Sequence, residues 1–132
     1  MRIVFAFVMA VGLFGTALAQ QNDVEQVIQG QMEAFKADDM DGAFGFAAEG
    51  IQRVFGSPER FGEMVRRGYP MVHRPKEVSF LELREEAGAL WQKVLVRDGA
   101  GVLHVLDYEM VPTEGGWRIG AVVLLRQAAV GA

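Results

Sequence analysis

A histidine and a tyrosine lie on one strand-like stretch of the chain, Val102–Val111, and together they offer acid–base chemistry. In an extended strand, successive side chains point to opposite faces, so His104 and Tyr108 share a face while Asp107 points to the other. An imidazole acts as a base near neutral pH, and a phenol donates a hydrogen bond to a carbonyl oxygen. The alternative interpretation is a core histidine that is hydrogen-bonded to a neighbour and a tyrosine that is packed beneath the sheet.

Proton transfer of the ketosteroid-isomerase type needs a carboxylate base and hydrogen-bond donors that stabilise an enolate. Asp39, Asp107 and Tyr69 are the residues that this scheme would use. Asp39 is explained better as the cap of a helix. Asp107 needs a bulge in its strand to turn toward the face of His104. An acid–base site therefore needs these residues to converge from separate elements.

Three further polar side chains are candidates for a ligand pocket. Gln31 interrupts the apolar stripe of a predicted helix, where its amide either orients a ligand or lies at a half-solvated edge. Tyr69 and His73 belong to the proline-bounded segment Tyr69–Pro75, which is either a pocket rim or a rigid connection. The neighbouring Arg66–Arg67 pair diverges by about 100° on a helix, which favours a solvated face over an anion site. The candidate pocket residues are Gln31, Tyr69, His73, His104 and Tyr108.

Composition excludes several kinds of chemistry. The 132 residues include no cysteine and two histidines, which lie on different predicted elements. Disulfides, thiolate zinc sites and iron–sulfur clusters are therefore excluded, and a transition-metal site is disfavoured. The sequence contains neither a phosphate-binding glycine-rich loop nor a Gly-x-Ser-x-Gly motif. The formal net charge of -4 argues against nucleic acid as a partner. We expect no metal, no cofactor and no nucleic acid.

Helix signals dominate the chain between residues 20 and 70. Asn22 is suited to cap a helix whose apolar residues recur at helical spacing. Asp39 is suited to cap a second helix. Ser57–Pro58 marks the start of a third helix, which ends at Gly68. The inner face of that third helix is predicted to carry Phe61, Met64 and Val65.

Four strand-like runs follow the helices, separated by short segments rich in turn residues. These runs are Glu77–Arg84, Leu90–Arg97, Val102–Val111 and Trp117–Arg126. Connections this short allow only antiparallel hairpins. The order predicts an α+β fold in which N-terminal helices pack on a curved four-stranded antiparallel sheet. No linker or repeat interrupts residues 20–132, so we expect them to form a single domain.

Residues 1–19 have the three parts of a secretory signal peptide. Arg2 gives a positive start, an uncharged apolar run follows, and Ala17-Leu18-Ala19 places small residues where a signal peptidase reads. A membrane anchor is the alternative, but the run is near the lower length limit for a span and contains glycines. We expect cleavage after Ala19, export to the periplasm or the extracellular space, and no stable membrane insertion afterwards.

The chain also resembles a known family in three segments, QMEAFKADDMDGAFGFAAEGI, FGSPERFGEMVRRGYPMVHRP and GWRIGAVVLL. These resemble the bacterial family called domain of unknown function 4864. The order of elements is similar to the nuclear-transport-factor-2-like, or cystatin-like, superfamily. That resemblance implies a cone, in which a bent sheet wraps a long helix and leaves a pocket at the open end. The superfamily includes isomerases, dehydratases, cyclases, ligand carriers and assembly modules, and no catalytic residue is established for the family, so function stays open.

Three functions of different classes are compatible with these features. The first is binding of a small apolar or amphipathic ligand in a cone pocket, because an apolar strand face with few polar members is typical of such pockets. The second is an acid–base isomerase, dehydratase or cyclase that uses His104, Tyr108 and an aspartate. The third is a homodimeric interaction module joined through the outer sheet face, where Trp91, Leu95 and Leu124 are expected to leave apolar surface exposed.

Overall fold

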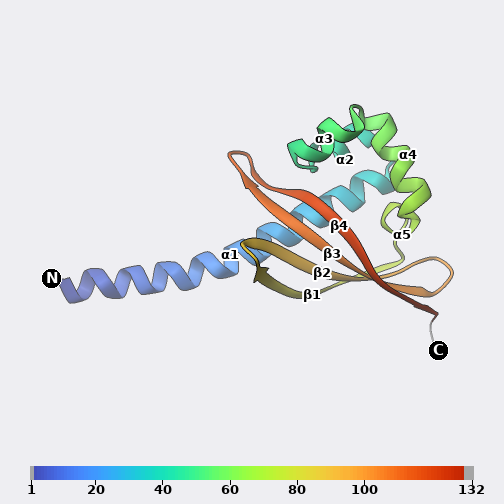
Figure 1. The fold of residues 1–132 in the computed structure, drawn as a ribbon. Helices are drawn as coiled ribbons and strands as arrows, with labels where there is room; N and C mark the ends of the chain where they lie inside the picture. The colour runs from blue at the N-terminus through green and yellow to red at the C-terminus, as the bar shows by residue number, and fades with distance from the viewer. Residues whose placement is uncertain (1, 130–132) are drawn as a thin grey trace.

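The computed structural model describes the backbone of residues 2–129 and the side chains of residues 17–127. Helices form the first part of the chain and a curved sheet forms the second (Figure 1). The helices are α1 (Arg2–Lys36), α2 (Met40–Gly45), α3 (Glu49–Phe55), α4 (Pro58–Gly68) and α5 (Pro70–His73). The strands are β1 (Glu77–Glu86), β2 (Ala89–Arg97), β3 (Val102–Thr113) and β4 (Gly116–Ala129).

Each strand pairs antiparallel with the next, in the order β1-β2-β3-β4. This confirms the predicted α+β fold and its antiparallel sheet. The pairing of β3 with β4 shifts register twice, between Val105 and Leu106 and between Glu109 and Met110. An extra residue in one strand reverses the alternation of side chains beyond it. Leu124 lies between the two shifts, so only the one between Glu109 and Met110 changes its face, and it pairs with Leu106 on the helix side of the sheet. Its predicted place on the outer face was wrong.

The core lies between α1 and the inner face of the sheet. Val24 and Ile28 of α1 are 0% exposed and Phe35 is 1% exposed. Val94 and Leu106, which pair across β2 and β3, are also 0% exposed. The shorter helices α2 to α5 gather around the C-terminal half of α1 (Figure 1). That arrangement places them beside β4, and no helix of the described residues covers the outer face of the sheet.

Two predicted helix caps are confirmed. Asp39 precedes α2, and its carboxylate accepts a hydrogen bond from the Gly42 backbone N–H at 3.0 Å. Ser57 precedes α4, and its hydroxyl accepts one from the Arg60 backbone N–H at 3.2 Å. Each cap satisfies a donor that has no partner inside the first turn of its helix.

The structure differs from the predicted helices at α1. We predicted a helix start at Asn22, but α1 runs unbroken from Arg2 and Asn22 lies within it, exposed to solvent. A capping residue acts as a cap only where the helix begins, and the alanine- and leucine-containing residues before it also favour helix. No helix in the described residues is both long enough and apolar enough to cross a membrane.

Two short helices were not predicted. Ala48 precedes α3 without a side-chain cap, so the usual sequence signal for a helix start is missing there. α5 spans four residues within the proline-bounded segment that we interpreted as a rim or a connection. One turn of helix is too short to show a periodic pattern.

The β1–β2 hairpin contains a strained alanine. Ala87 and Gly88 form its turn with φ values of 52° and 83°. A two-residue turn of this kind needs positive φ at both positions, which glycine adopts without the steric cost that a Cβ imposes. Replacing Ala87 with Gly is expected to raise the free energy of unfolding by up to about 1 kcal/mol, measured by urea denaturation. The same change at Ala100, which has no positive φ, should give no such gain, and equal gains at both positions would contradict the explanation.

Candidate functional site

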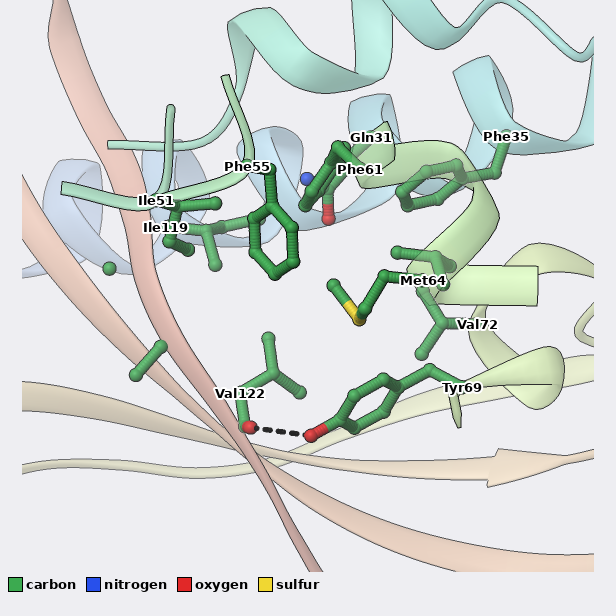
Figure 2. Close-up of a pocket in the computed structure, with 13 residues that line it drawn as sticks. Gln31, Phe35, Ile51, Phe55, Phe61, Met64, Tyr69, Val72, Ile119 and Val122 are labelled. Atoms are coloured by element: carbon green, nitrogen blue, oxygen red, sulfur yellow. Dashed lines mark hydrogen bonds between the residues drawn. The ribbon is translucent and has the colours of Figure 1, made fainter. Parts of the chain in front are cut away.

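A cavity of about 290 Å³ lies between the helices and the edge strand β4 (Figure 2). This volume is close to the lower end of small-molecule sites, about 300 Å³. The lining is mainly apolar, and no charged side chain belongs to it among the described residues. The lining residues are Gln31, Phe35, Ile51, Phe55, Phe61, Met64, Val65, Tyr69, Val72, Ile119, Gly120, Ala121 and Val122.

The edge of β4 holds the helices in place around this cavity. Ala47, between α2 and α3, forms a parallel bridge with Ile119 of β4. The Ala48 N–H donates to the Ile119 carbonyl at 2.8 Å, and the Ile119 N–H donates to the Phe46 carbonyl at 2.9 Å. The chain between α2 and α3 therefore continues the sheet by one bridge, and α3 begins directly beside the cavity.

In a cluster of phenylalanines, Phe35, Phe55 and Phe61 form one wall, and Phe44 packs against Phe61 without lining the cavity. The ring centroid of Phe61 lies 5.8 Å from that of Phe35, 5.5 Å from that of Phe44 and 5.8 Å from that of Phe55. Phe61 is 4% exposed. These rings come from four different helices, so contacts of Phe61 join α1, α2, α3 and α4 around the cavity.

Gln31 supplies the polar group at one end of the cavity. Its side chain projects from α1 and is 3% exposed. The Gln31 Nε2 donates to the Ala43 carbonyl of α2 at 3.2 Å. A carbonyl can only accept, so this bond fixes which end of the amide is nitrogen. The amide oxygen lies on the side that faces the cavity (Figure 2).

Tyr69 supplies the polar group at the other end. It caps the C-terminus of α4 and precedes α5. Its hydroxyl donates to the Val122 carbonyl on the edge of β4 at 3.2 Å (Figure 2). Of the five predicted pocket residues, Gln31 and Tyr69 line the cavity, and the other three lie elsewhere.

Tyr108 lies in the core beside the cavity. It is 0% exposed and pairs with Val122 across β3 and β4, on the helix side of the sheet. Its hydroxyl has no hydrogen-bond partner in the described structure. Burial, and to a lesser degree the neighbouring Tyr69, raises the pKa of the Tyr108 hydroxyl. Tyr108 is therefore neutral at physiological pH and contributes volume to the wall behind Val122.

His104 lies at the far end of the same strand, in a network with the β2–β3 turn. It is 3% exposed, and its Nε2 lies 2.8 Å from Asp98 Oδ2. An ionised carboxylate only accepts, so this imidazole nitrogen carries the proton. The other ring nitrogen, Nδ1, lies 3.0 Å from Gln127 Nε2. Both nitrogens of His104 are engaged within the protein.

His73 binds a second aspartate, on the surface. Its Nε2 lies 3.0 Å from Asp38 Oδ1, and Arg74 approaches the same carboxylate at 3.1 Å. Arg66 of α4 lies 3.6 Å from it. Asp38 follows α1 with a φ of 56°, a conformation that aspartate tolerates better than most residues. This cluster fixes the end of α1 against α4 and α5.

The two aspartate clusters predict how stability depends on pH. Hydrogen bonds from His73 lower the pKa of Asp38, and hydrogen bonds from His104 lower the pKa of Asp98. A lowered folded-state pKa stabilises the fold above the unfolded value of 3.8, and the contribution is lost as the pH falls through the folded-state pKa. In Asp98→Asn and in Asp38→Asn, the unfolding free energy should therefore fall less steeply than in the wild type as the pH is lowered from about 5 to about 3, measured by urea denaturation. Glu114→Gln changes an exposed turn carboxylate and should leave the slope unchanged, and a similar flattening there would contradict the assignment.

The proposed acid–base residues do not converge on one cavity. Asp107 lies on the outer face of the sheet, where its Oδ2 lies 2.6 Å from Arg84 Nη2 and its Oδ1 lies 3.0 Å from Arg84 Nη1. His104 and Tyr108 lie on the opposite face, and Asp39 caps α2. Within the described residues, no group of three or more histidine, aspartate and glutamate side chains is arranged to hold a metal ion.

Sequence reasoning missed part of the lining. Ile51 and Phe55 belong to α3, whose start has no capping side chain, so no signal placed them at a site. Phe61, Met64 and Val65 were predicted as an inner helix face, and they line the cavity.

Comparison with known proteins assigns the chain to a family. No curated protein and no solved structure matches the sequence. A family model described as "Domain of unknown function (DUF4864)" matches residues 17–132, which is most of the chain. The chain belongs to this family.

Proposed function

We propose that the protein binds a small apolar or amphipathic ligand in the cavity between α1, α3, α4, α5 and β4. The observation that carries this proposal is an apolar cavity of about 290 Å³ with two polar groups at its opposite ends. Ligand sites have this composition, in which apolar walls supply affinity and a few polar groups supply orientation. The separation of His104, Tyr108 and Asp107 gives the acid–base alternative no comparable support.

Blocking the cavity tests the proposal. Val122→Phe adds a ring to a half-buried lining side chain, and it should weaken binding of an apolar fluorescent probe by at least about tenfold, measured by titration. The matched control is Val105→Phe, because Val105 is also half-buried but lies on the outer face of the sheet. The wild-type protein and the control should bind the probe saturably. Absence of saturable binding to the wild-type protein, or equal binding to all three, would refute the cavity as the site.

We also propose that the protein is exported and cleaved after Ala19. Among the described side chains, the first buried one in α1 is Val24, and Ala17 to Ala19 are exposed. The family match begins at residue 17. Removal of residues 1–19 would leave the described core intact. Mass spectrometry of the protein from the cell envelope should give the mass of residues 20–132, whereas an intact leader would contradict cleavage.

A second candidate function is homodimerisation, and the end of β4 favours it. Val123, Leu124 and Leu125 are 43%, 38% and 49% exposed. They follow one another on an edge strand, where unpaired backbone groups accept another strand. Sedimentation analysis should then give a dimer that Leu125→Lys dissociates, and a monomer at all concentrations would exclude this candidate.

A further inference from the structure

We infer that the cavity selects uncharged ligands with a hydrogen-bond donor, such as alcohols, over carboxylates and over ligands that only accept. This inference rests on the proposed binding function and specifies the ligand class for the same cavity. It follows from what the two polar ends of the cavity offer, and from where the neighbouring cations are held.

The first end offers an acceptor. The Gln31 side chain is 3% exposed, and its Nε2 donates one of its two hydrogens to the Ala43 carbonyl, which holds the nitrogen on the α2 side. The oxygen that remains faces the cavity (Figure 2), and no hydrogen bond to it occurs among the described residues. An amide oxygen accepts but never donates. A ligand that satisfies it must bring an O–H or an N–H.

The second end also offers an acceptor. The Tyr69 hydroxyl has one proton, which it donates to the Val122 carbonyl. Its oxygen keeps lone pairs that can accept a further hydrogen bond. Using the hydroxyl as a donor to a ligand would break the bond that ties it to β4. Both polar ends of the cavity thus favour a ligand that donates a hydrogen bond.

The cavity gives no compensation for a negative charge. A carboxylate that leaves water needs a cation or several donors, and no lining side chain is charged. Arg66 of α4 and Arg74, which follows α5, do not neutralise a charge in the cavity, because both bind Asp38 at the surface. A carboxylate would also meet the Gln31 oxygen, which repels it.

Three probes of matched length test this selectivity by calorimetric titration: octanol, its isomer heptyl methyl ether, and octanoate at neutral pH. Octanol should bind about three- to tenfold more tightly than the ether, because the ether has the same atoms but no donor. Octanoate should bind most weakly. Gln31→Met keeps the length of the side chain but removes the buried amide acceptor, so it should reduce the octanol-to-ether ratio to the smaller preference that the Tyr69 oxygen alone supports. Gln29→Met, at an exposed position of the same helix, should keep the ratio.

The outcomes separate the two levels of the proposal. Equal binding of octanol and ether, tighter binding of octanoate, or an unchanged ratio in Gln31→Met would overturn the selectivity while leaving ligand binding intact. Failure of all three probes to bind the folded protein would overturn the binding function and the selectivity together. Thermal melting of both variants confirms that each is folded during the titrations.

Discussion

Replacing Phe61 with alanine is expected to lower the free energy of unfolding by about 3–5 kcal/mol. Phe61 is 4% exposed, and its ring packs against Phe35, Phe44 and Phe55. The substitution removes a buried ring that already borders a cavity. The neighbouring side chains therefore lose their contacts with the ring and border a larger empty space. Urea denaturation followed by tryptophan fluorescence measures the change. We expect this to be among the most damaging single substitutions in the helical layer.

Phe46→Ala provides the comparison for that result. Phe46 is half-buried, its ring packs close to Gly30, and it belongs to none of the ring pairs of the cluster in the described residues. Its loss should cost roughly 1–2 kcal/mol, because less apolar surface returns to water. If both substitutions destabilise equally, the cluster around Phe61 has no special role in holding the four helices together.

The sequence predicted the fold well because its signals are local. The caps at Asp39 and Ser57 each act within one turn, and the short separators between strands allow only hairpins. The missed elements lack such signals. Ala48 has no side-chain oxygen with which to cap α3, and α5 is a single turn. The bulge opposite Glu109 and Met110 that moves Leu124 to the inner face depends on the pairing of two strands, which a single strand does not reveal.

The site was less predictable, for a related reason. Alternation placed His104 and Tyr108 on the same face of their strand, and the structure shows that this is the inner face. Alternation does not tell which face meets the helices or which part of it borders a cavity. β4 forms part of the cavity wall because two backbone contacts hold the helices against it. Ile119 is hydrogen-bonded to the α2–α3 connection, and the Val122 carbonyl accepts a hydrogen bond from the Tyr69 hydroxyl. Both contacts join residues that are distant in sequence. Gln31 was detectable because a polar residue in an apolar stripe is a local irregularity.

Arg84→Ala is expected to cost about 2–4 kcal/mol of unfolding free energy, although it changes a residue on the outer face of the sheet. Asp107 beside it is only 5% exposed, and it is bound by two Arg84 nitrogens at 3.0 and 2.6 Å. The Asp107 hydrogen bonds raise the pKa of the Arg84 guanidinium. Removing the arginine leaves a carboxylate that is shielded from water without its partner. The penalty comes from that stranded charge more than from the lost attraction.

A double substitution separates these two contributions. Arg84→Met with Asp107→Leu replaces both charges by apolar groups of similar size, so it should recover most of the stability lost in Arg84→Ala. Arg97→Ala is the control, because its ion pair with Glu77 also lies on the outer face but has side chains that are 45% and 62% exposed. Exposed pairs contribute roughly 0–1 kcal/mol, so this control should unfold at nearly the wild-type urea concentration. If Arg97→Ala is as damaging as Arg84→Ala, burial of Asp107 is not what makes the Arg84–Asp107 pair important for stability. If the double substitution recovers none of the unfolding free energy lost in Arg84→Ala, the hydrogen bonds between Arg84 and Asp107 themselves stabilise the fold.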